Sequence, residues 1–296
     1  MVSIAMTTYN GEKYLREQID SILVQTIQDF ELIVCDDCST DSTVEILEEY
    51  QQNDKRIKVY RNDSNLGFKK NFEKAISLCN GEYIALSDQD DIWTENHLEL
   101  LISNIGNKSL VCGNSDIVDE NGLALGMTLK YQESFDSINN NDLKKLLSIV
   151  IFRNPFQGAT MLFKKDVVEH ILPIPSDVLF HDTWIASVAC LTGGINYVDS
   201  SLMKYRRTSS SITGERLCRK SKFAHFKELR LGPDKYSLVR NLQYRLHTLD
   251  SKQESLLVEL AAYCKRNGNR WGRRLNTLYM IRHYKSIFNC DYSHWI

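Results

Sequence analysis

The sequence predicts an α/β fold with a mostly parallel central sheet, and two observations carry this prediction. Short apolar runs of strand length alternate with longer segments of helical periodicity between residues 2 and 87. Three of the apolar runs end in polar or acidic residues, at Thr8, Asp36 and Asp88. Such alternation favours parallel strands with right-handed crossovers, whose carboxyl ends meet at one edge of the sheet. We therefore expect a ligand site at that edge.

The first half of the chain supplies the elements of this sheet in turn. Expected strands cover residues 2–6, 30–35, 57–60 and 83–87, and expected helices lie between them at residues 14–23, 41–50 and 68–78. No glycine-rich dinucleotide fingerprint follows the first strand, and the chain contains no Walker phosphate loop. Phosphate would have to be bound differently, and acidic strand ends with a divalent cation provide one route.

Three carboxylates crowd the turn after the fourth expected strand, at Asp88, Asp90 and Asp91. Carboxylates so close together repel one another unless a proton or a cation lies among them. Oxygen ligands suit hard divalent ions, so we expect Mn²⁺ or Mg²⁺ here. The same residues also fit a solvated acidic turn in which Asp91 or Thr94 caps the next helix.

The second half of the chain is expected to continue the α/β pattern. It predicts a strand at residues 110–116, a buried helix at 141–152, a strand ending at Phe163, a helix through 185–191 and closing strand segments at 196–199 and 202–208. Gly158 precedes the third of these elements, where the lack of a side chain would let another group come close to the backbone.

Four segments together resemble family 2 glycosyltransferases of the GT-A fold. They are Thr8-Tyr9-Asn10, residues 36–41, residues 65–67 and the turn at residues 88–93, in the order that the family has. The resemblance runs from about residue 1 to about residue 214 and weakens beyond. It implies a catalytic domain at 1–214, with a nucleotide-sugar half at 1–105 and an acceptor half at 106–214, and a basic helical region at 215–296.

The resemblance also implies roles for individual residues. Donor binding would fall to Thr8, Tyr9, Asp37, Lys70, Asn71 and Asp88, and Asp88 and Asp90 would hold the Mn²⁺ or Mg²⁺ ion. Acceptor contacts would come from Trp93, Gly158, His181 and Trp184. From the residues alone, Asp37 equally fits a helix-capping turn, Lys70 a solvated surface charge and His181 a histidine with no chemical part.

Asp182 matches the acidic residue that serves as the catalytic base in the family. An inverting displacement needs a carboxylate within reach of the attacking hydroxyl, on the face opposite the departing diphosphate. The alternative is an acid that stabilises the start of a helix through the helix dipole.

The end of the resembling region departs from the family pattern. Arg206 and Arg207 are expected to bind phosphate, but many relatives carry a histidine two residues after the arginine that Arg206 matches, and this chain has Thr208. Metal dependence is less secure for that reason. What replaces the histidine would have to come from neighbouring residues.

Charge is distributed unevenly along the chain. Residues 1–200 carry 16 Lys and Arg against 31 Asp and Glu, whereas residues 201–296 carry 20 against 7. Amphipathic patterns at 222–231, 236–249, 254–264 and 271–288 combine cations with apolar and aromatic residues, which suits an anionic membrane surface. Helices that pack their apolar stripe on the core would have the same pattern, and so would intramolecular pairing with the acidic front.

The resemblance to family 2 glycosyltransferases implies an inverting glycosyltransferase, and the motifs at residues 88–93 and 181–184 are most similar to those of bacterial surface polysaccharide synthesis. Its donor would be a nucleotide sugar, with dTDP-rhamnose as the hypothesis for the sugar, and its acceptor a glycan or a polyprenyl-diphosphate-linked sugar. We expect no nucleic-acid partner and a cytoplasmic protein that can associate peripherally with the inner face of the membrane. The alternatives are a sugar nucleotidyltransferase, which usually needs a basic glycine-rich loop absent from residues 7–11, and a non-catalytic relative that binds membranes.

Overall fold

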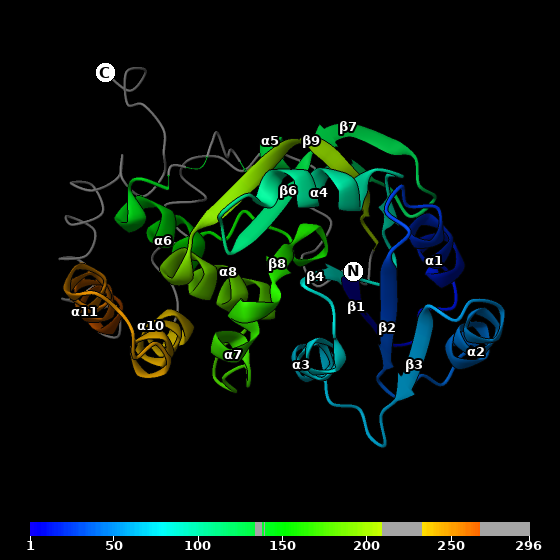
Figure 1. Ribbon diagram of the computed structural model, residues 1–296, viewed down its shortest axis with the longest axis horizontal. Coiled ribbons are helices and arrows are strands. Elements are labelled where there is room, and N and C mark those ends of the chain that lie inside the picture. The colour runs from blue at the N-terminus through cyan, green and yellow to red at the C-terminus, as the bar shows by residue number, and fades with distance from the viewer. Residues whose placement is uncertain (134–137, 139, 209–232, 267–296) are drawn as a thin grey trace.

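The computed structural model describes residues 1–133, 138, 140–208 and 233–266. These residues form one nine-stranded sheet with helices on both faces (Figure 1). The strand order is β3-β2-β1-β4-β8-β6-β9-β5, and β7 pairs with β6 outside this path. The strands are β1 (Val2–Thr8), β2 (Phe30–Asp36), β3 (Ile57–Arg61), β4 (Tyr83–Ser87), β5 (Ile92–Trp93), β6 (Leu110–Val118), β7 (Ala124–Thr128), β8 (Leu162–Lys164) and β9 (Ile195–Arg206).

The N-terminal half of the sheet is parallel, as the βα alternation predicts. β3, β2, β1 and β4 pair in parallel, with Thr8 opposite Asp36 and Met6 opposite Ser87. The strand order reverses between β1 and β4, which is where open α/β sheets place their ligands. This register brings the polar ends of β1, β2 and β4 to the same edge.

The second half of the sheet mixes directions. β8 is antiparallel to both β4 and β6, and β5 and β7 pair antiparallel to β9 and β6, while β6 and β9 are parallel. The sequence pattern predicted strands at the positions of β6, β8 and β9 but not at β5 or β7, and it carries no information about strand direction. The antiparallel pairs are therefore an addition to the predicted, mostly parallel sheet.

Helices cover the two faces of the sheet. One face packs against α1 (Leu15–Leu23), α2 (Thr43–Asn53) and α4 (His97–Ile105), and the other against α3 (Phe68–Leu78), α6 (Leu143–Phe152) and α8 (His181–Thr192). Along β1 the side chains alternate, with Ile4 and Met6 in the first core and Ala5 in the second. Shorter helical turns are α5 (Leu129–Gln132), η1 (Gly158–Thr160), η2 (Lys165–Val167) and α7 (Val168–Ile171).

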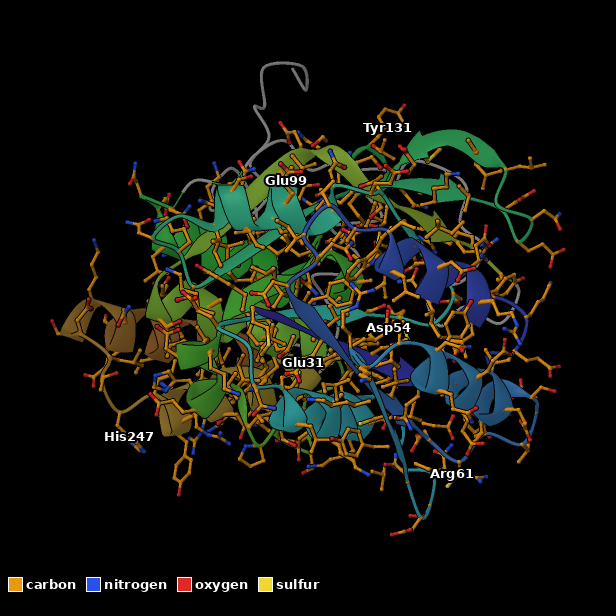
Figure 2. The ribbon with its side chains drawn as sticks, turned by 45° about the vertical axis from the view of Figure 1, so that its right-hand side comes forward. Glu31, Asp54, Arg61, Glu99, Tyr131 and His247 are labelled. Atoms are coloured by element: carbon orange, nitrogen blue, oxygen red, sulfur yellow. The ribbon has the colours of Figure 1, made fainter. Side chains whose placement is uncertain are left out.

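Two C-terminal helices extend the second core. α10 (Pro233–Arg245) and α11 (Ser251–Arg266) lie beside α6 and α8, opposite the end of the molecule that carries β3 and α2 (Figure 1). Figure 2 shows the same separation between His247, which follows α10, and Arg61 on β3. Leu242 and Leu257 are fully buried in the core that also contains residues of α6 and α8, so this part of the tail packs on those two helices.

The remaining tail predictions fall elsewhere. The amphipathic patterns at 222–231 and 271–288 lie outside the described residues. Among the described residues, no helix combines the length and the apolar character needed to span a membrane.

Candidate active site

Hydrogen bonds join three loops at the carboxyl edge of the sheet. The Asp37 amide, after β2, donates to the Thr8 carbonyl at the end of β1 at 2.9 Å. The Gln89 side chain, from the acidic turn after β4, accepts from the Tyr9 amide at 2.8 Å and donates to the Tyr9 carbonyl at 3.1 Å. A Cβ at Gly11 would lie 2.3 Å from Gln89 Oε1, so a larger residue there would displace the Gln89 side chain. The loops after β1, β2 and β4 are thus held together, and the Tyr9 side chain is half exposed.

The predicted donor residue Asp37 holds the start of α3. Its Oδ1 accepts from Asn62 Nδ2 and from the Leu66 amide, both at 2.7 Å, and its Oδ2 accepts from the Gly67 amide at 2.8 Å. The carboxylate is 3% exposed. The two backbone amides fix the orientation of this carboxylate. They lie 29 and 30 residues further along the chain, just before α3, so Asp37 does not form the local helix-capping turn that its sequence position also allowed. Donor binding by Asp37 stays a prediction.

Thr8 and Asn71 are also tied into this edge. The Thr8 hydroxyl donates to Asp36 Oδ1 at 2.9 Å. Asn71 donates to the Cys35 carbonyl at 2.7 Å and accepts from Asn62 at 2.9 Å, and it is 1% exposed. Both side chains therefore brace the strand ends, with little of their polar surface facing solvent.

The acidic turn concentrates negative charge. Burial, followed by the nearby carboxylates of Asp90 and Asp182, raises the pKa of Asp88 to about 7. Burial also raises the pKa of Asp90, and the Asp91 pKa rises well above its usual value through burial and the charges of Asp90 and Asp88. Asp182 is close enough to act on the Asp88 carboxylate, although the two residues are 94 positions apart in the sequence. The backbone agrees with this, because the Leu86 amide of β4 donates to the Met161 carbonyl at 3.1 Å, and a Cβ on Gly158, three residues before Met161, would lie 3.6 Å from Asp182 Cβ.

The donor set of this turn fits a divalent cation. Asp91 Oδ2 is buried without a hydrogen-bond partner among the described residues, and a nearby cation would relieve the repulsion among these acids. Within the described ranges, no group of three or more His, Cys, Asp or Glu could hold a metal ion. A cation held by Asp88 and Asp90 would keep positions open for substrate oxygens, as is usual for Mg²⁺ sites.

The prediction that Arg206 binds phosphate is corrected by its contacts. The side chain is 2% exposed, donates to the Asp90 and Glu120 carbonyls at 2.9 and 3.0 Å, and forms an ion pair with Glu17. Its amide donates to Asp91 Oδ1 at 3.2 Å. Arg206 is thus a buried residue whose hydrogen bonds hold the backbone of the acidic turn in place.

Arg207 and Thr208 follow Arg206 in the sequence. Arg207 donates to Gln132 Oε1 at 2.9 Å, and its guanidinium lies 4.8 Å from the centre of the Tyr205 ring. Thr208 is buried, and the residues that follow it are outside the described part of the chain. A phosphate-binding role for Arg207 stays a prediction.

Asp182 lies in the first turn of α8 and retains partial exposure. Burial raises its pKa to about 6, against hydrogen bonds from the Thr183 amide and hydroxyl that lower the pKa. A carboxylate with a pKa near 6 is largely ionised at neutral pH and still a competent proton acceptor. The position suits a general base, and it also stabilises the N-terminus of α8 through the helix dipole.

His181 and Gly158 lie against each other beside Asp182. A Cβ on Gly158 would be 3.2 Å from His181 Nε2 and 3.6 Å from Asp182 Cβ, so a larger residue would displace the side chains at the start of α8. The His181 ring stacks on Phe72 with 4.1 Å between centroids. Both ring nitrogens are buried without a hydrogen-bond partner among the described residues, and burial lowers the His181 pKa to about 3. The imidazole is therefore neutral.

The prediction that Trp93 and Trp184 contact the acceptor is wrong. Trp93 is 3% exposed and stacks on His97 with 3.8 Å between ring centroids. Trp184 is fully buried, and its indole donates to the Ile171 carbonyl at 2.8 Å. Both side chains belong to the core, because their helix or strand turns them away from the edge where the acids gather.

Phe68 and Phe180, which were not predicted to contact the acceptor, are exposed near the start of α8. Phe68 is 39% and Phe180 42% exposed, and their rings lie 6.2 Å apart. The Phe68 ring is also 6.0 Å from His181. We call this pair the phenylalanine rim. Phe180 could have been found from its place directly before the His181-Asp182 pair.

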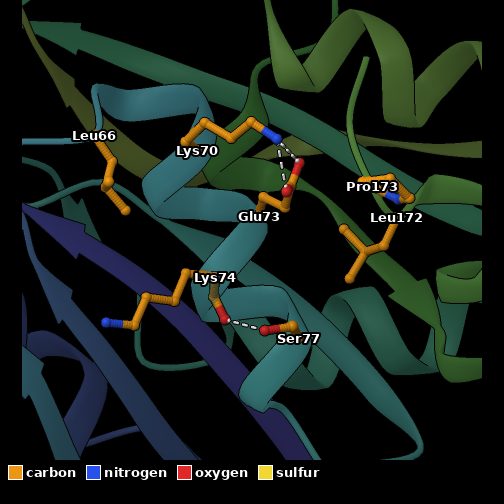
Figure 3. Close-up of a pocket in the computed structure, with 7 residues that line it drawn as sticks. All are labelled: Leu66, Lys70, Glu73, Lys74, Ser77, Leu172 and Pro173. Carbon is orange, nitrogen blue, oxygen red and sulfur yellow. Dashed lines mark hydrogen bonds and ion pairs between the residues drawn. The ribbon is translucent and has the colours of Figure 1, made fainter. Parts of the chain in front are cut away.

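Lys70 faces a different part of the surface. Its ammonium pairs with Glu73 at 2.8 Å on the outer side of α3 (Figure 3). A hollow of about 720 Å³ lies there, bordered by Leu66, Lys70, Glu73, Lys74, Ser77, Leu172 and Pro173. None of the predicted site acids borders this hollow, so we place the chemistry at the acidic edge, where the carboxylates converge. The partly exposed ion pair of Lys70 with Glu73 agrees with the interpretation of Lys70 as a surface charge.

The segment between α7 and α8 is anchored on two sides. From α3, Lys69 Nζ donates to the carbonyls of Pro175, Ser176 and Val178 at 3.2, 2.6 and 2.6 Å. From α10, the Arg245 guanidinium donates to the carbonyls of Leu172 and Pro173. This segment leads directly into Asp182, so both helices fix the approach to the proposed base.

Left-handed backbone marks the site as well. Among the described residues, the non-glycine residues with positive φ are Asn10, Cys38 and Asn154, at 48°, 65° and 36°. Asn10 follows β1, Cys38 follows Asp37, and Asn154 donates to Thr183 beside Asp182. Such conformations cost free energy and tend to gather at functional sites.

The chain matches the family model "Glycosyl transferase family 2" over residues 3–172. It is 30% identical over 221 residues to UDP-Glc:alpha-D-GlcNAc-diphosphoundecaprenol beta-1,3-glucosyltransferase WfgD of Escherichia coli, covering 73% of this chain and 81% of that one. It is 30% identical over 257 residues to dTDP-rhamnosyl transferase RfbG of Shigella flexneri, covering 81% of each chain. An uncharacterized glycosyltransferase of Haemophilus influenzae is 30% identical over 217 residues, 70% of this chain, and the match spans 65% of its length.

Solved structures show the same fold. The chain superposes on Staphylococcus aureus TarS 1-349 in complex with UDP-GlcNAc with a TM-score of 0.62 at 19% identity, over 97% of this chain and 78% of that one. It superposes on mannosyltransferase PcManGT from Pyrobaculum calidifontis, in complex with GDP-Man and Mn²⁺, with a TM-score of 0.54 at 16% identity, over 98% and 88% of the two chains. The α/β sheet, the acidic edge and the sequence match agree, and the chain belongs to glycosyl transferase family 2.

Proposed function

We propose that the chain transfers a sugar from a nucleoside diphosphate sugar to a hydroxyl of a glycan or lipid-linked acceptor, with inversion, in polysaccharide synthesis. The observation that carries this proposal is the convergence of two acidic groups from separate halves of the chain. Asp88 and Asp90 lie in the turn after β4, and Asp182 lies in the first turn of α8, close enough to raise the pKa of Asp88. One group suits the diphosphate end of the donor and the other suits the attacking alcohol.

The residues divide the reaction between them. Asp182 accepts the proton of the acceptor hydroxyl, and the oxygen forms a bond to the anomeric carbon as the bond to the diphosphate oxygen breaks. Attack from the face opposite the leaving group inverts the anomeric configuration. A Mn²⁺ or Mg²⁺ ion bound at Asp88 and Asp90 would neutralise charge on the departing diphosphate. Arg206 keeps those carboxylates in place through the Asp90 carbonyl.

The donor end is proposed at the edge formed by Tyr9, Asp37 and Asn71. The half-exposed Tyr9 ring offers a face for a nucleobase, and the braced polar groups behind it give the pocket a fixed shape. The names of RfbG and WfgD and the ligands of TarS and PcManGT indicate dTDP, UDP and GDP sugars among similar proteins. Because the match to RfbG covers 81% of each chain, dTDP-rhamnose is the first donor to test.

The acceptor end is proposed at His181, Gly158 and the phenylalanine rim. A sugar ring has an apolar face that can lie on an exposed aromatic side chain, and Phe180 directly precedes the first turn of α8. The close approach of Gly158 to His181 leaves the backbone near the ring nitrogens that lack partners. A hydroxyl bound there would lie next to Asp182.

The decisive experiment combines a donor panel with one substitution. Purified protein is incubated with dTDP-, UDP- and GDP-sugars and lipid-linked acceptors, with Mn²⁺ or with a chelator, and products are identified by mass spectrometry. Asp182→Asn should lower kcat by about 100- to 10,000-fold, the usual contribution of a general base, and leave donor affinity unchanged. Asp199→Asn is the matched control, because Asp199 is an exposed acid on β9. Unchanged transfer by Asp182→Asn would remove this residue from the mechanism.

We also propose that the basic tail brings the protein to the inner face of the membrane. Residues 201–296 carry 20 Lys and Arg against 7 Asp and Glu, which favours anionic headgroups. Cosedimentation of the full chain with vesicles of anionic lipid, and not with neutral vesicles, is the expected result at low salt. Equal binding to both kinds of vesicle, or to neither, would contradict the proposal.

A further inference from the structure

A chain of hydrogen bonds reaches the proposed base from α6. Asn154, just beyond the C-terminal cap of α6, donates from Nδ2 to Thr183 Oγ1 at 3.0 Å. The Thr183 hydroxyl donates to Asp182 Oδ1 at 3.2 Å, and the Thr183 amide donates to the same oxygen. An amide nitrogen can only donate, and a hydroxyl has one proton. The direction of the chain is therefore fixed, from Asn154 through Thr183 to Asp182.

Asn154 also ends α6 in a left-handed backbone conformation. Its φ is 36°, in the left-handed region, and its amide donates to the Ile149 and Val150 carbonyls that end α6. Glycine is the usual residue at such a helix end, because it adopts this conformation without strain. Asparagine tolerates the conformation less well than glycine but supplies a donor that reaches α8.

From this geometry we infer that Asn154 and Thr183 are positioning residues that hold Asp182 by Oδ1 and leave Oδ2 to take the acceptor proton. The inference rests on the proposed function, since it assigns the orientation of the proposed base. Neither residue touches the reacting atoms in this scheme. Their contribution is to fix which carboxylate oxygen faces the substrate and at what angle, which general-base catalysis requires.

Other groups near Asp182 act on it in different ways. Asp88, at the end of β4, is the carboxylate whose pKa Asp182 perturbs, and Asp90 lies on the same turn. His181 is neutral in its buried position and contributes no charge. The hydrogen bonds from Thr183 are the contacts that favour the ionised form of Asp182, while burial opposes it. Removing the Thr183 hydroxyl should therefore raise the Asp182 pKa.

The first test compares Thr183→Val with Thr183→Ser. Valine keeps the shape and loses the hydroxyl, whereas serine keeps the hydroxyl. We expect Thr183→Val to lower kcat at least about tenfold, a part of what a general base contributes, and to move the acidic limb of kcat/KM to higher pH, with donor affinity unchanged. Thr183→Ser should restore both. A wild-type rate and pH profile in Thr183→Val would overturn the inference.

The second test uses Asn154→Gly, which separates the side chain from the backbone. Glycine relieves the left-handed conformation, so the melting temperature should stay the same or rise. If the side chain positions the base through Thr183, kcat should fall although the protein is as stable as before. Full activity in Asn154→Gly would show that Asn154 serves only as a helix end.

A readout without substrate separates this inference from the proposed function. Carboxyl ¹³C chemical shifts report the Asp182 titration in the free protein, with Asp182→Asn identifying the signal. The midpoint should be higher in Thr183→Val than in wild type, and an equal midpoint would contradict the contact. If Asp182→Asn retains transfer, the proposed function fails. If Asp182→Asn loses transfer while Thr183→Val and Asn154→Gly match wild type, only the positioning roles fail.

Discussion

The donor edge and the acceptor side of the site satisfy their polar groups in different ways. At the donor edge, Asp37, Asn71 and Thr8 are hydrogen-bonded to other parts of the protein. On the acceptor side, both nitrogens of His181 and Oδ1 of Asn154 are buried without a partner among the described residues. A buried polar group without a partner is unfavourable unless a ligand or water supplies one.

This difference separates the two proposed binding surfaces. The proposed donor edge is shaped in advance by its own hydrogen bonds, which would lower the entropic cost of binding a nucleotide. The proposed acceptor side has buried polar atoms without partners among the described residues next to an exposed aromatic surface, and we propose that the acceptor supplies the missing hydrogen bonds. Three substitutions test this contrast, starting with the donor edge.

Asp37→Ala should have the largest effect. It leaves the amides of Leu66 and Gly67 and the Asn62 side chain without their acceptor. Loss of charge-assisted bonds at a buried site should reduce the free energy of unfolding by roughly 3 kcal/mol or more and weaken nucleotide binding, because α3 loses its anchor. Urea unfolding and calorimetric titration with UDP and dTDP measure the two effects.

Asp63→Ala is the control for this substitution, since Asp63 is an exposed acid on the loop between β3 and α3, which also carries the Leu66 and Gly67 amides. Its stability should stay close to that of wild type. If Asp37→Ala is as stable as Asp63→Ala, the donor edge is not shaped by its own side chains and the contrast with the acceptor side is lost.

His181→Phe should have an intermediate effect that depends on pH. The folded-state pKa of His181 is lowered to about 3, so between about pH 6.5 and 3 the unfolded chain binds a proton that the folded protein does not. The wild type therefore loses stability as the pH falls through this range, by up to about 2 kcal/mol at pH 5 from this residue. His181→Phe has no titrating group at this position, so this loss of stability at low pH should be absent in the variant. The KM of the variant for the acceptor should rise, because His181 is a proposed acceptor contact.

Urea unfolding at pH 7 and pH 5 gives the difference directly. The variant His247→Phe serves as control, because His247 is exposed beyond α10. An equal pH dependence in His181→Phe and His247→Phe would mean that His181 is not buried in its neutral form.

Phe180→Ala should have the smallest effect, confined to the acceptor. An aromatic contact contributes about 0.5–1.5 kcal/mol, so the acceptor KM should rise about 2- to 10-fold with the donor KM unchanged. Tyr244→Ala removes an aromatic ring that is 80% exposed on α10 and should change neither constant. A rise in the donor KM instead would place the phenylalanine rim on the donor side.

Much of the donor edge could be predicted from the sequence because its determinants are local. Thr8, Asp37 and Asp88 each follow an apolar run of strand length, and parallel strands bring such ends together. The strand ending at Phe163, β8, was predicted, but its antiparallel direction was not, since the sequence pattern does not encode strand direction. The two-residue strand β5 was not predicted at all. Their pairing with β4 and β9 depends on the complete sheet.

The acceptor side was predicted less well because its contacts are distant in sequence. Trp93 and Trp184 looked like site residues next to the acidic motifs, but packing turned both into the core. Arg206 looked like a phosphate ligand and is instead bonded to Glu17 and Asp90, 189 and 116 residues away. The contact between Asn154 and Thr183 spans 29 residues and two helices, and no sequence motif announces it.

The double anchoring of the segment before α8 bears on how such enzymes can be recombined. A chimera that joins the catalytic half of this chain to the tail of a relative would keep Lys69 but lose the Arg245 contacts, unless α10 came along. Exchanging the tail ahead of residue 266 would then also disturb the segment that leads into Asp182. A crossover placed after residue 266 preserves this anchoring and leaves the distal tail open to exchange.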